Sequence, residues 1–579
     1  MASGERGTLA RTLLTAWATL LLGLLVYPLF MPADSGIFSG QLALRDMMVI
    51  DHPALSRGAL GFGDLAARNS PQDGLLTLIG MVMPASWFVR VLIVVAGAVG
   101  ALGAAWLVRV IASGSASSRA VSSGAGGFGA ERESVGEAAG SAADGDGAEG
   151  AGVGRGVVWG QAAAITVTLW NPFVVERFLQ GHWSLVIAAW LLPLIAAAAL
   201  RRSFVIQLLA MWLASLTPTG ALFAVVVGVV SAREWRRRLV ILGFGVLMSL
   251  PWIVPGLLMG STSSSTGATA FAPRAEAWTG TLGSLLGLGG IWNADAVPAS
   301  REAGFAVFGI LLFAVLLLGA RRVPVRLLVL GAVGLGSAAL AWLLPGVMGW
   351  LISAVPGAGL LRDSQKLVML AIPVYAAMAG GVVFAGSSRS VGVGVWGVGV
   401  SGASARSTGV LRTNVRPAAP AVLVILLAVL QIPDAPRVMQ QLAPVEVPVD
   451  EELVERADGR DVLLMGAAPL TVIEGRVVVE PMSKALSLVE SGALVVDGEV
   501  VDPPSERWVQ AQEAWAAGDV SALEQLGVGL VVDGDQVVDT GAPTQRGWEY
   551  WLGLALLVAW VVVPVGIGTG RKPLYSLTL

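Results

Sequence analysis

Long, uninterrupted stretches of apolar residues recur along the whole chain. Each has about 17–25 residues, and a helix of that length crosses a hydrocarbon core of roughly 30 Å. The first, Leu13 to Met31, follows Arg6 and Arg11. It is longer than the apolar part of a cleaved signal peptide, about 7–15 residues, so it predicts a retained signal anchor. Further runs lie near 87–108, 157–173, 183–200, 239–257, 304–320, 327–344, 366–385, 417–433 and 548–567.

The stretch 204–232 differs because Thr217–Gly220 interrupts it. It is too short for two full spans, which need about 40 residues. Arginines nevertheless flank it on both sides, at Arg201 and Arg202 and again at 233–238. The positive-inside rule places both clusters in the cytoplasm, so the chain must enter the membrane and return. We predict two short helices that meet at the Pro-Gly turn, which must be buried in protein or face a wet cavity.

The basic residues between the other runs alternate consistently with this arrangement. Arginine-bearing segments near 109–155, 321–326, 389–416 and 571–572 fall on the cytoplasmic side. The pattern predicts about twelve transmembrane helices, with both termini cytoplasmic. Nearly all basic residues are Arg, and Ala, Gly and Val are abundant, which is typical of a GC-rich bacterial genome. We therefore expect a multi-pass protein of a bacterial plasma membrane.

Composition excludes several classes of protein. Of the 579 residues, 55% are hydrophobic and 13% are charged, about half the charged fraction of a soluble chain. The absence of cysteine excludes disulfides, thiolate zinc sites and a cysteine nucleophile. Two histidines are too few for a His-rich metal centre, and a net charge of −3 predicts no nucleic-acid partner.

The polar segments divide the chain into domains. We expect a polytopic membrane domain over 1–433, an extracytoplasmic α/β domain over 434–546, and a final helix with a cytoplasmic tail over 547–579. The α/β domain has 21 acidic against 7 basic residues. It alternates β-rich runs with one helical stretch: Val462–Met465, Val472–Val479, Leu494–Val501 and Val528–Val532 as strands, and Glu506–Gln525 as helix. The first outer loop is 32–86, and the low-complexity linkers 113–155 and 386–416 are predicted to be disordered.

The first outer loop contains one cluster of candidate chemistry, with Asp46, Asp51 and His52. A carboxylate at the membrane surface can act as a general base on a hydroxyl, or hold a divalent cation such as Mg or Mn. On a helix the two aspartates would lie roughly 140° apart, so they share a face only if the backbone bends. Helix capping and turn formation are the alternative roles. We take Asp46 and Asp51 as candidate catalytic residues and His52 as a candidate substrate ligand.

A second cluster joins two predicted spans on the outer side. Asn171 precedes a proline and should end the incoming helix. Glu176 and Arg177 follow, and His182 lies just before the next span. The two charged neighbours could pair with each other. Alternatively, Arg177 and His182 could face a phosphate or a sugar, and we include Glu176 among the candidate substrate-binding residues.

The third cluster precedes the span at 366–385. A Gly-rich turn at 356–359 leads to Arg362, Asp363 and Lys366. Such a turn before a helix N-terminus, with two cations four residues apart, can bind a phosphate. Interfacial anchoring of Lys366 is the alternative. Because both cations lie outside, against the positive-inside bias, they need a reason to be there.

These features together resemble the GT-C superfamily of integral membrane glycosyltransferases, and more narrowly multi-pass actinobacterial proteins of that type. The resemblance rests on the acid-bearing first loop after a signal anchor, the short helix pair around Pro218, the Asn171–His182 segment and the Arg-Asp-Ser-Gln-Lys loop at 362–366. The run Leu523–Val532 is also similar to a helix-then-strand element of their outer domains.

The resemblance implies a polyprenyl-phosphate sugar as donor and an envelope glycan or glycolipid as acceptor. It implies that Asp46 or Asp51 deprotonates the acceptor, or ligates a metal, while Arg177, Arg362 and Lys366 stabilise the departing lipid phosphate. Several of these families have adjacent paired acids. Here the two aspartates are five residues apart, so which of them would be the base stays open.

Two other functions fit the same sequence. A lipid or solute transporter would place charges near the bilayer midplane, whereas these spans are almost free of charge, Arg90 being an exception. A non-catalytic scaffold of the same fold would use the acids only as caps and bind partner proteins through its acidic domain. Membrane lipids are partners under all three hypotheses.

Overall fold

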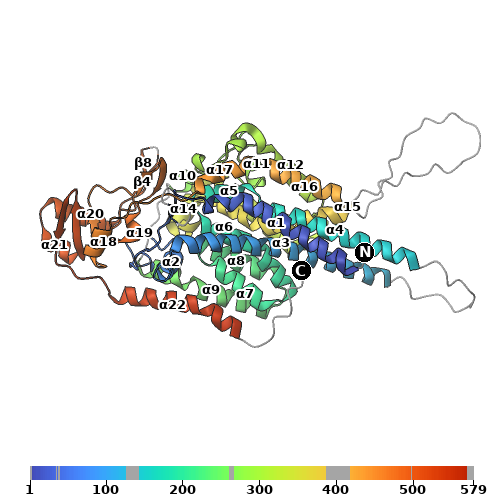
Figure 1. The fold of residues 1–579 in the computed structure, drawn as a ribbon, viewed down its shortest axis with the longest axis horizontal. Coiled ribbons are helices and arrows are strands. Elements are labelled where there is room, and N and C mark those ends of the chain that lie inside the picture. Colours follow the sequence, from blue (N-terminus) through green and yellow to red (C-terminus); the bar gives the residue numbers. More distant parts are fainter. Residues whose placement is uncertain are drawn as a thin grey trace, which may run out of the picture.

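The computed structural model describes residues 3–33, 36, 39–124, 143–259, 267–355, 357–386, 417–496 and 498–569. The chain forms a long helical bundle with a small α/β domain at one end (Figure 1). Within the described residues, eight helices are long and apolar enough to cross a membrane. They are Gly7–Phe30, Ala85–Ser113, Trp183–Arg201, Trp235–Met259, Val325–Leu343, Ser364–Ala385, Ala418–Leu442 and Trp548–Ile567.

The shorter apolar helices match most of the other predicted runs. The stretch 204–232 forms α7 (Phe204–Ala214) and α8 (Pro218–Ser231), as the interrupting Pro-Gly turn predicted. The run 304–320 forms only the shorter α12 (Val307–Leu317). The run 157–173 lies in α4 (Ala143–Leu169), which ends before Asn171 as predicted. A further short apolar helix, α14 (Pro345–Ala354), was not predicted.

Two elements form the centre of the bundle. In α6 (Trp183–Arg201) and in the segment Ser364–Ala385, 94% and 89% of the most apolar window is buried. Helix α3 (Ala85–Gly124) lies close against α6 because it has glycines at the contact. A Cβ on Gly100 would lie 2.8 Å from the backbone oxygen of Trp190, so the spacing Gly97–Gly100–Gly103 serves packing within this chain.

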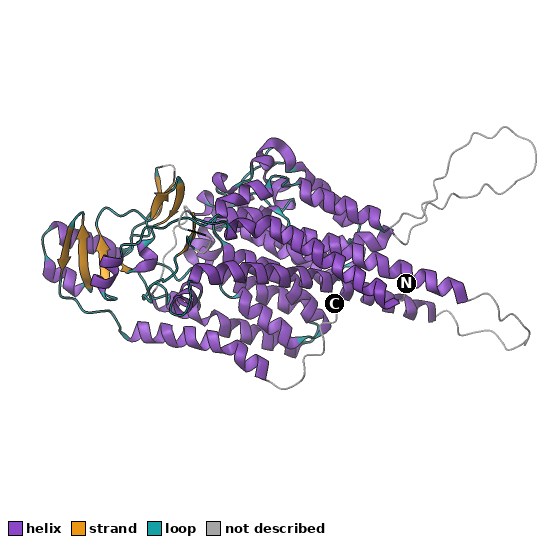
Figure 2. Ribbon diagram, in the orientation of Figure 1, coloured by secondary structure: helices purple, strands orange, loops and turns teal. Residues whose placement is uncertain are grey.

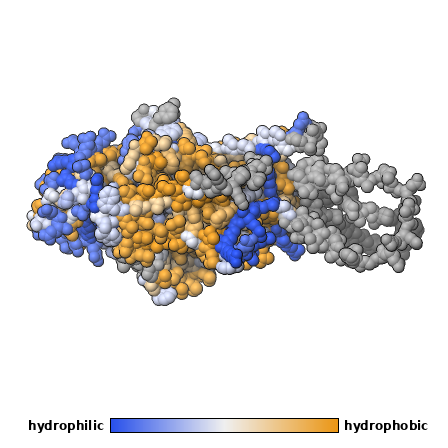
Figure 3. All heavy atoms as spheres, turned by 90° about the horizontal axis from the view of Figure 1, so that it is seen from below, coloured by the Kyte–Doolittle hydropathy of each residue, from blue (hydrophilic) through white to orange (hydrophobic). Residues whose placement is uncertain are grey.

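The outside of the bundle is apolar, as a membrane-embedded protein requires. Figure 3 shows a broad hydrophobic band over the helices, between the hydrophilic α/β domain and a hydrophilic patch toward the opposite end. Helix α9 (Trp235–Met259) and the candidate span within α22 (Trp548–Thr569) have 33% and 22% of their apolar windows buried, so most of these two surfaces is available to lipid.

Strands occur mainly in the α/β domain (Figure 2). Its four-stranded sheet has the order β10-β9-β3-β6, with β3 (Asp461–Leu464) parallel to β6 (Ser487–Leu488) and to β9 (Val528–Asp533). The strand β10 (Gln536–Asp539), which was not predicted, is antiparallel to β9. Helices α18 (Glu451–Ala457), α20 (Glu506–Ala516) and α21 (Val520–Gln525) complete the domain.

Three predictions for this domain need correction. The runs at 472–479 and 494–501 form hairpins rather than single strands, because each contains a glycine with positive φ, Gly475 at 73° and Gly498 at 83°. The hairpins are β4–β5 (Leu470–Ile473, Arg476–Val479) and β7–β8 (Leu494–Val496, Glu499–Asp502). The single helix expected over 506–525 is two helices, since Gly518 turns the chain at φ 68° and Asp519 caps α21.

The remaining helices and strands complete the connections. Of the linker predicted at 113–155, residues up to Gly124 continue α3 and those from Ala143 begin α4. Residues 125–142, and 387–416 of the second linker, lie outside the described residues.

The other elements are α1 (Ser3–Val26), β1 (Leu42–Leu44), β2 (Met47–Val49), α2 (Gln72–Gly80), α5 (Pro172–Leu179), α10 (Gly267–Ala270), α11 (Gly280–Leu286), α13 (Val325–Leu343), α15 (Ile372–Gly386), α16 (Ala418–Leu430), α17 (Ala435–Val438), α19 (Met482–Ala485), and the 3-10 segments η1 (Tyr27–Phe30), η2 (Ala294–Ala296), η4 (Ala320–Arg322), η5 (Ala358–Leu361), η6 (Ser364–Ala371) and η7 (Met439–Leu442), with a π-type turn at Arg301–Phe305.

Candidate functional site

A tight hairpin in the first outer loop places Asp46 beside the α5–α6 turn. Strands β1 and β2 pair antiparallel, and Arg45 and Asp46 form the tip. The Asp46 amide donates to the Gln180 carbonyl at 3.1 Å. Gly181 has φ +90°, and a Cβ there would lie 2.2 Å from the Met47 amide nitrogen. Only glycine fits at this contact, because any side chain would push the hairpin away.

The Asp46 carboxylate is held by two side chains of that turn. It accepts hydrogen bonds from His182 Nε2 at 2.9 Å and from Gln180 Nε2 at 3.0 Å. The His182 Nδ1 lies 3.2 Å from Arg177 Nη1. A guanidinium can only donate, so Nδ1 accepts, and the hydrogen of a neutral His182 is on Nε2, directed at Asp46. The Asp46 side chain is 46% exposed and can reach a substrate.

The electrostatics agree with this assignment of hydrogens. Partial burial raises the pKa of Asp46, but the hydrogen bonds from His182 and Gln180 and the charge of Lys366 outweigh it and bring the pKa below its usual value. Burial lowers the pKa of His182, and the nearby cations Lys366 and Arg177 lower it further, against the opposing effect of Asp46. At neutral pH, Asp46 is therefore an ionised acceptor and His182 is a neutral donor.

A buried ion pair connects this cluster to the loop before the span at 366–385. The Arg177 guanidinium binds Asp363 through both terminal nitrogens, Nη1 to Oδ2 at 2.5 Å and Nη2 to Oδ1 at 2.8 Å. The Arg177 side chain is fully buried, and Gln365 Oε1 also accepts from its Nη2. Lys366 Nζ lies 3.6 Å from Asp363 Oδ2 and is 22% exposed. Residues from all three predicted clusters thus form one chain of contacts, from Asp46 through His182, Arg177 and Asp363 to Lys366.

Arg362 points to the α/β domain instead of into this chain. Its Nη1 donates to both carboxylate oxygens of Asp502, at 2.9 and 2.7 Å, and its guanidinium lies 4.3 Å from the centre of the Phe271 ring. Arg68 of the first loop approaches the same carboxylate at 3.8 Å. Four cations, Arg68, Arg177, Arg362 and Lys366, pair with only two carboxylates, Asp363 and Asp502. This positive excess is compatible with an anionic ligand.

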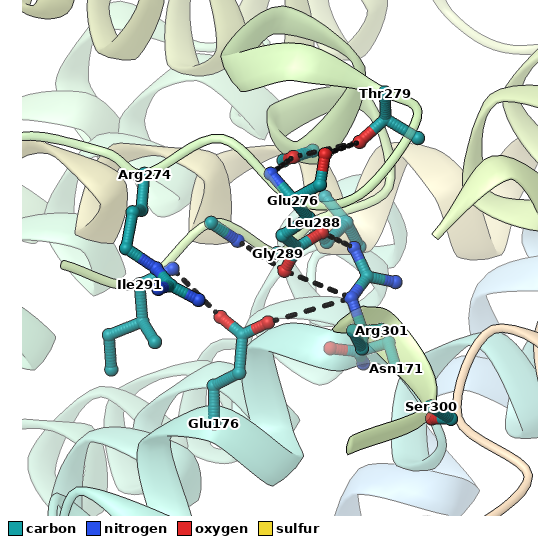
Figure 4. Close-up of polar contacts among 12 residues, drawn as sticks. Asn171, Glu176, Arg274, Glu276, Thr279, Leu288, Gly289, Ile291, Ser300 and Arg301 are labelled. Carbon is teal, nitrogen blue, oxygen red and sulfur yellow. Dashed lines mark hydrogen bonds and ion pairs between the residues drawn. The ribbon is translucent and has the colours of Figure 1, made fainter. Parts of the chain in front are cut away.

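Glu176 does not pair with Arg177 but faces a separate buried group (Figure 4). Its Oε2 accepts from the Ile291 amide at 3.0 Å, and its Oε1 lies 3.8 Å from Arg301. Arg301 pairs closely with Glu276, donating from Nε at 3.0 Å. Burial and the neighbouring Glu276 raise the pKa of Glu176 well above its usual value, whereas Arg301 keeps the pKa of Glu276 low. One guanidinium thus neutralises one carboxylate, and the other carboxyl is protonated.

This group packs against the first chain of contacts without being part of it. A Cβ on Gly289 would lie 2.5 Å from Arg301 Nη2 and 2.9 Å from a Glu176 oxygen, so the backbone must approach closely here. The Gln365 amide donates weakly to the Leu288 and Gly289 carbonyls at 3.4 Å. Glu176 therefore contributes to the rigidity of the loop below the site rather than contacting substrate.

Asp51 and His52 lie away from Asp46. The Asp51 side chain accepts from the Ser86 hydroxyl at 2.5 Å and its carbonyl accepts from the Ala85 amide, so Asp51 caps the start of α3. His52 Nδ1 lies 2.8 Å from the Gly80 carbonyl at the end of α2. For these two residues the structure shows the alternative capping role, and of the two candidate bases only Asp46 contacts the other predicted clusters.

The donor set does not suit a divalent cation. Among the described residues, no group of three or more His, Cys, Asp or Glu side chains gathers as metal ligands would. Oδ2 of Asp46 is already the acceptor for two side chains, and the charge of Lys366 acts on the same carboxylate. Mg²⁺ and Mn²⁺ prefer several oxygen ligands without a competing cation. We therefore derive no step through a metal.

Known proteins do not identify this site. Comparison with protein-family models, with curated proteins and with solved structures finds no match.

Several site residues were not predicted from the sequence. Gln180 and Gln365 lie inside the second and third predicted clusters. Their position between candidate residues was the signal by which the sequence could have identified them. Arg68 lies in the same first loop as Asp46 but was not chosen as a site residue, whereas Asp502, and the partners Glu276 and Arg301 of Glu176, lie in separate segments. No local pattern marks these four, because they become part of the site only through the tertiary fold.

Proposed function

We propose that this protein is a GT-C-type membrane glycosyltransferase that moves a sugar from a polyprenyl-phosphate donor to an acceptor hydroxyl in an envelope glycan or glycolipid. One observation carries the proposal. An exposed carboxylate, Asp46, is hydrogen-bonded to His182 and lies within electrostatic reach of Lys366 at one end of an apolar bundle. A lipid-linked phosphate sugar needs this combination of a membrane-edge position, cationic groups for the phosphate and a base for the hydroxyl.

The residues divide the reaction between them. The acceptor oxygen attacks the anomeric carbon, and the bond between that carbon and the phosphate oxygen breaks. The acceptor proton passes to Asp46, which His182 holds in position with its Nε2 hydrogen. Lys366 and Arg362 stabilise the negative charge that stays on the polyprenyl phosphate. Arg177 contacts His182 and Asp363 contacts Lys366, so these two buried residues act through their neighbours and are positioning residues.

The orientation follows from where the basic residues lie. His182 caps the N-terminus of α6, and Arg201 and Arg202 lie at its other end, about 28 Å away along the helix. We infer that the arginine-rich end is cytoplasmic and that the site and the α/β domain face outward. About twelve crossings, with both termini cytoplasmic in a bacterial plasma membrane, complete the proposed topology.

The test compares aspartate variants of the purified protein in liposomes. A panel of polyprenyl-phosphate sugars is supplied with an acceptor extract of the host envelope, and release of polyprenyl phosphate is measured. We expect D46N to lower the rate at least about 100-fold, since general-base catalysis contributes roughly that much or more. D51N should keep most of the rate, because Asp51 caps a helix. D535N, in an exposed position of the α/β domain, is the matched control.

No release of polyprenyl phosphate above the protein-free background by the folded wild type, with every donor of the panel, would overturn the proposal and favour the scaffold hypothesis. Equal, measurable rates for wild type and D46N would reject Asp46 as the base.

A further inference from the structure

The β7–β8 hairpin is separate from the main sheet of the α/β domain. Its two strands pair only with each other within the described residues. Its base is fixed by Ser505, whose amide donates to the Ser491 carbonyl at 2.7 Å and whose hydroxyl donates to the Glu490 carbonyl at 2.7 Å. Outward from that base, Val495 and Val500 are 57% and 56% exposed. A movement of the hairpin about its base would therefore break no pairing of the four-stranded sheet, although the buried Val501, 2% exposed, would have to leave its present contacts.

Asp502 at the end of β8 joins this hairpin to the candidate site. Both of its oxygens accept from Arg362 Nη1, at 2.9 and 2.7 Å, and the side chains are only 15% and 12% exposed. Arg68 lies 3.8 Å from the same carboxylate. The two arginines repel each other, and Asp502 is the counter-ion between them. A carboxylate and a phosphate offer a guanidinium equivalent oxygen acceptors.

We propose that Asp502 is an internal substitute for phosphate, and that the β7–β8 hairpin is a latch over the anion site. The latch is closed while Asp502 neutralises Arg362 and Arg68. A phosphate monoester brings up to two negative charges where Asp502 brings one, so it displaces the carboxylate and releases the hairpin. The identification of the anion as a lipid phosphate rests on the proposed function, whereas the exchange of carboxylate for phosphate rests on the contacts of Asp502.

The first experiment measures phosphate binding to variants of the full chain in detergent. Farnesyl phosphate is the probe and farnesol is the uncharged control. We expect D502N to bind farnesyl phosphate about five- to tenfold more tightly than wild type, because the competing charge is gone. E499Q removes an exposed carboxylate of the same hairpin and should bind like wild type. Unchanged or weaker binding by D502N would overturn the latch, since Asp502 would then merely orient Arg362.

The second experiment follows the hairpin itself and leaves Asp502 intact. The chain has no cysteine, so E499C gives a single site for a nitroxide label. We expect farnesyl phosphate to increase the mobility of the label and farnesol to leave it unchanged. The same response to inorganic phosphate at equal concentration would support the latch and identify free phosphate as a sufficient ligand. A label that stays immobile when farnesyl phosphate is bound would refute it.

These outcomes separate the latch from the glycosyltransferase proposal. Tighter phosphate binding by D502N together with D46N that transfers sugar normally would retain the latch and reject Asp46 as the base. Loss of transfer in D46N together with unchanged phosphate binding by D502N would support Asp46 as the base and reject the latch.

Discussion

The Arg177–Asp363 pair offers the sharpest test of how the site is held together. Its members come from α5 and from the loop before η6, and both lie deep beside the central helix α6. The Arg177 side chain is 0% exposed and that of Asp363 is 6% exposed, with two hydrogen bonds between them. Burial raises the pKa of Asp363, but Arg177 and Lys366 outweigh it and hold the pKa well below its usual value, so the pair is ionic at neutral pH.

The magnitude follows from what each substitution leaves behind. D363N leaves the Arg177 charge buried with no carboxylate partner, and R177M leaves the Asp363 charge with only the more distant Lys366. Removing one partner of a buried pair costs about 3–5 kcal/mol. The double variant R177M/D363L removes both charges and fills the space with apolar groups, so it should recover most of that loss. The coupling free energy between the sites should then exceed about 3 kcal/mol, because the two single losses add to at least about 6 kcal/mol and the double variant loses much less.

The assay is unfolding in mild detergent, by SDS titration or scanning fluorimetry, on the two single variants and the double variant. The Arg202–Glu234 pair is the matched control, because its N–O distance is 2.8 Å but its side chains are 68% and 54% exposed. The same double-variant cycle on that pair should give at most about 1 kcal/mol. Additive losses at Arg177 and Asp363, or a coupling no larger than in the control pair, would refute the buried connection from His182 to Lys366.

Two further predictions concern carboxyl groups whose charge the fold controls. Burial, together with neighbouring aspartates, raises the pKa of Glu490 to about 7. A carboxyl group whose pKa is raised on folding makes its full contribution to stability below pH 4.5, the ordinary pKa. That contribution is lost as the pH rises from there through about 7, the pKa in the folded protein. E490Q should therefore stabilise the protein at pH 8, by about 1–2 kcal/mol after allowance for partial exposure, and have little effect at pH 5 in thermal melts. Glu176 is protonated and Glu276 is ionised, so E176Q should change stability by less than about 1 kcal/mol while E276Q, which strands Arg301, costs about 3 kcal/mol. Equal losses for these two variants in the same melts would contradict the assignment of the proton.

The sequence predicted the helices well, because their determinants are local. Apolar runs of membrane-spanning length and the arginines around α7 and α8 are properties of neighbouring residues. The sheet of the α/β domain could be predicted only as a set of strands. Its order depends on the parallel pairing of β3 with β9, two segments far apart in the chain, and no periodicity encodes that pairing. Each of the two hairpins was predicted as a single strand, although a glycine inside the run, Gly475 or Gly498, was visible in the sequence. A glycine can adopt the positive φ of a tight turn, so these residues were the signal that was missed.

The site shows the same division. Five of the candidates meet because each lies at the same end of the bundle, either at the end of a central helix or in a loop packed on one: Asp46, Arg177, His182, Asp363 and Lys366. Asp51 and His52 were expected beside Asp46. They diverge because the chain forms a β-hairpin there, with Asp46 at the tip and Asp51 beyond the end of β2, where it caps α3.

The α/β domain contacts the site from two sides, which the sequence could not reveal. On one side, β5 hydrogen-bonds the backbone of Arg45, with the Arg45 amide 2.8 Å from the Val477 carbonyl and the Val479 amide 3.1 Å from the Arg45 carbonyl. Asp46 is the next residue, so this hairpin fixes the backbone that presents the Asp46 carboxylate. On the other side, β8 supplies Asp502 to Arg362. A domain that only solvated the outer surface would need neither contact. Because one hairpin holds the backbone beside Asp46 and the other pairs with Arg362, the acidic domain is part of the candidate site itself.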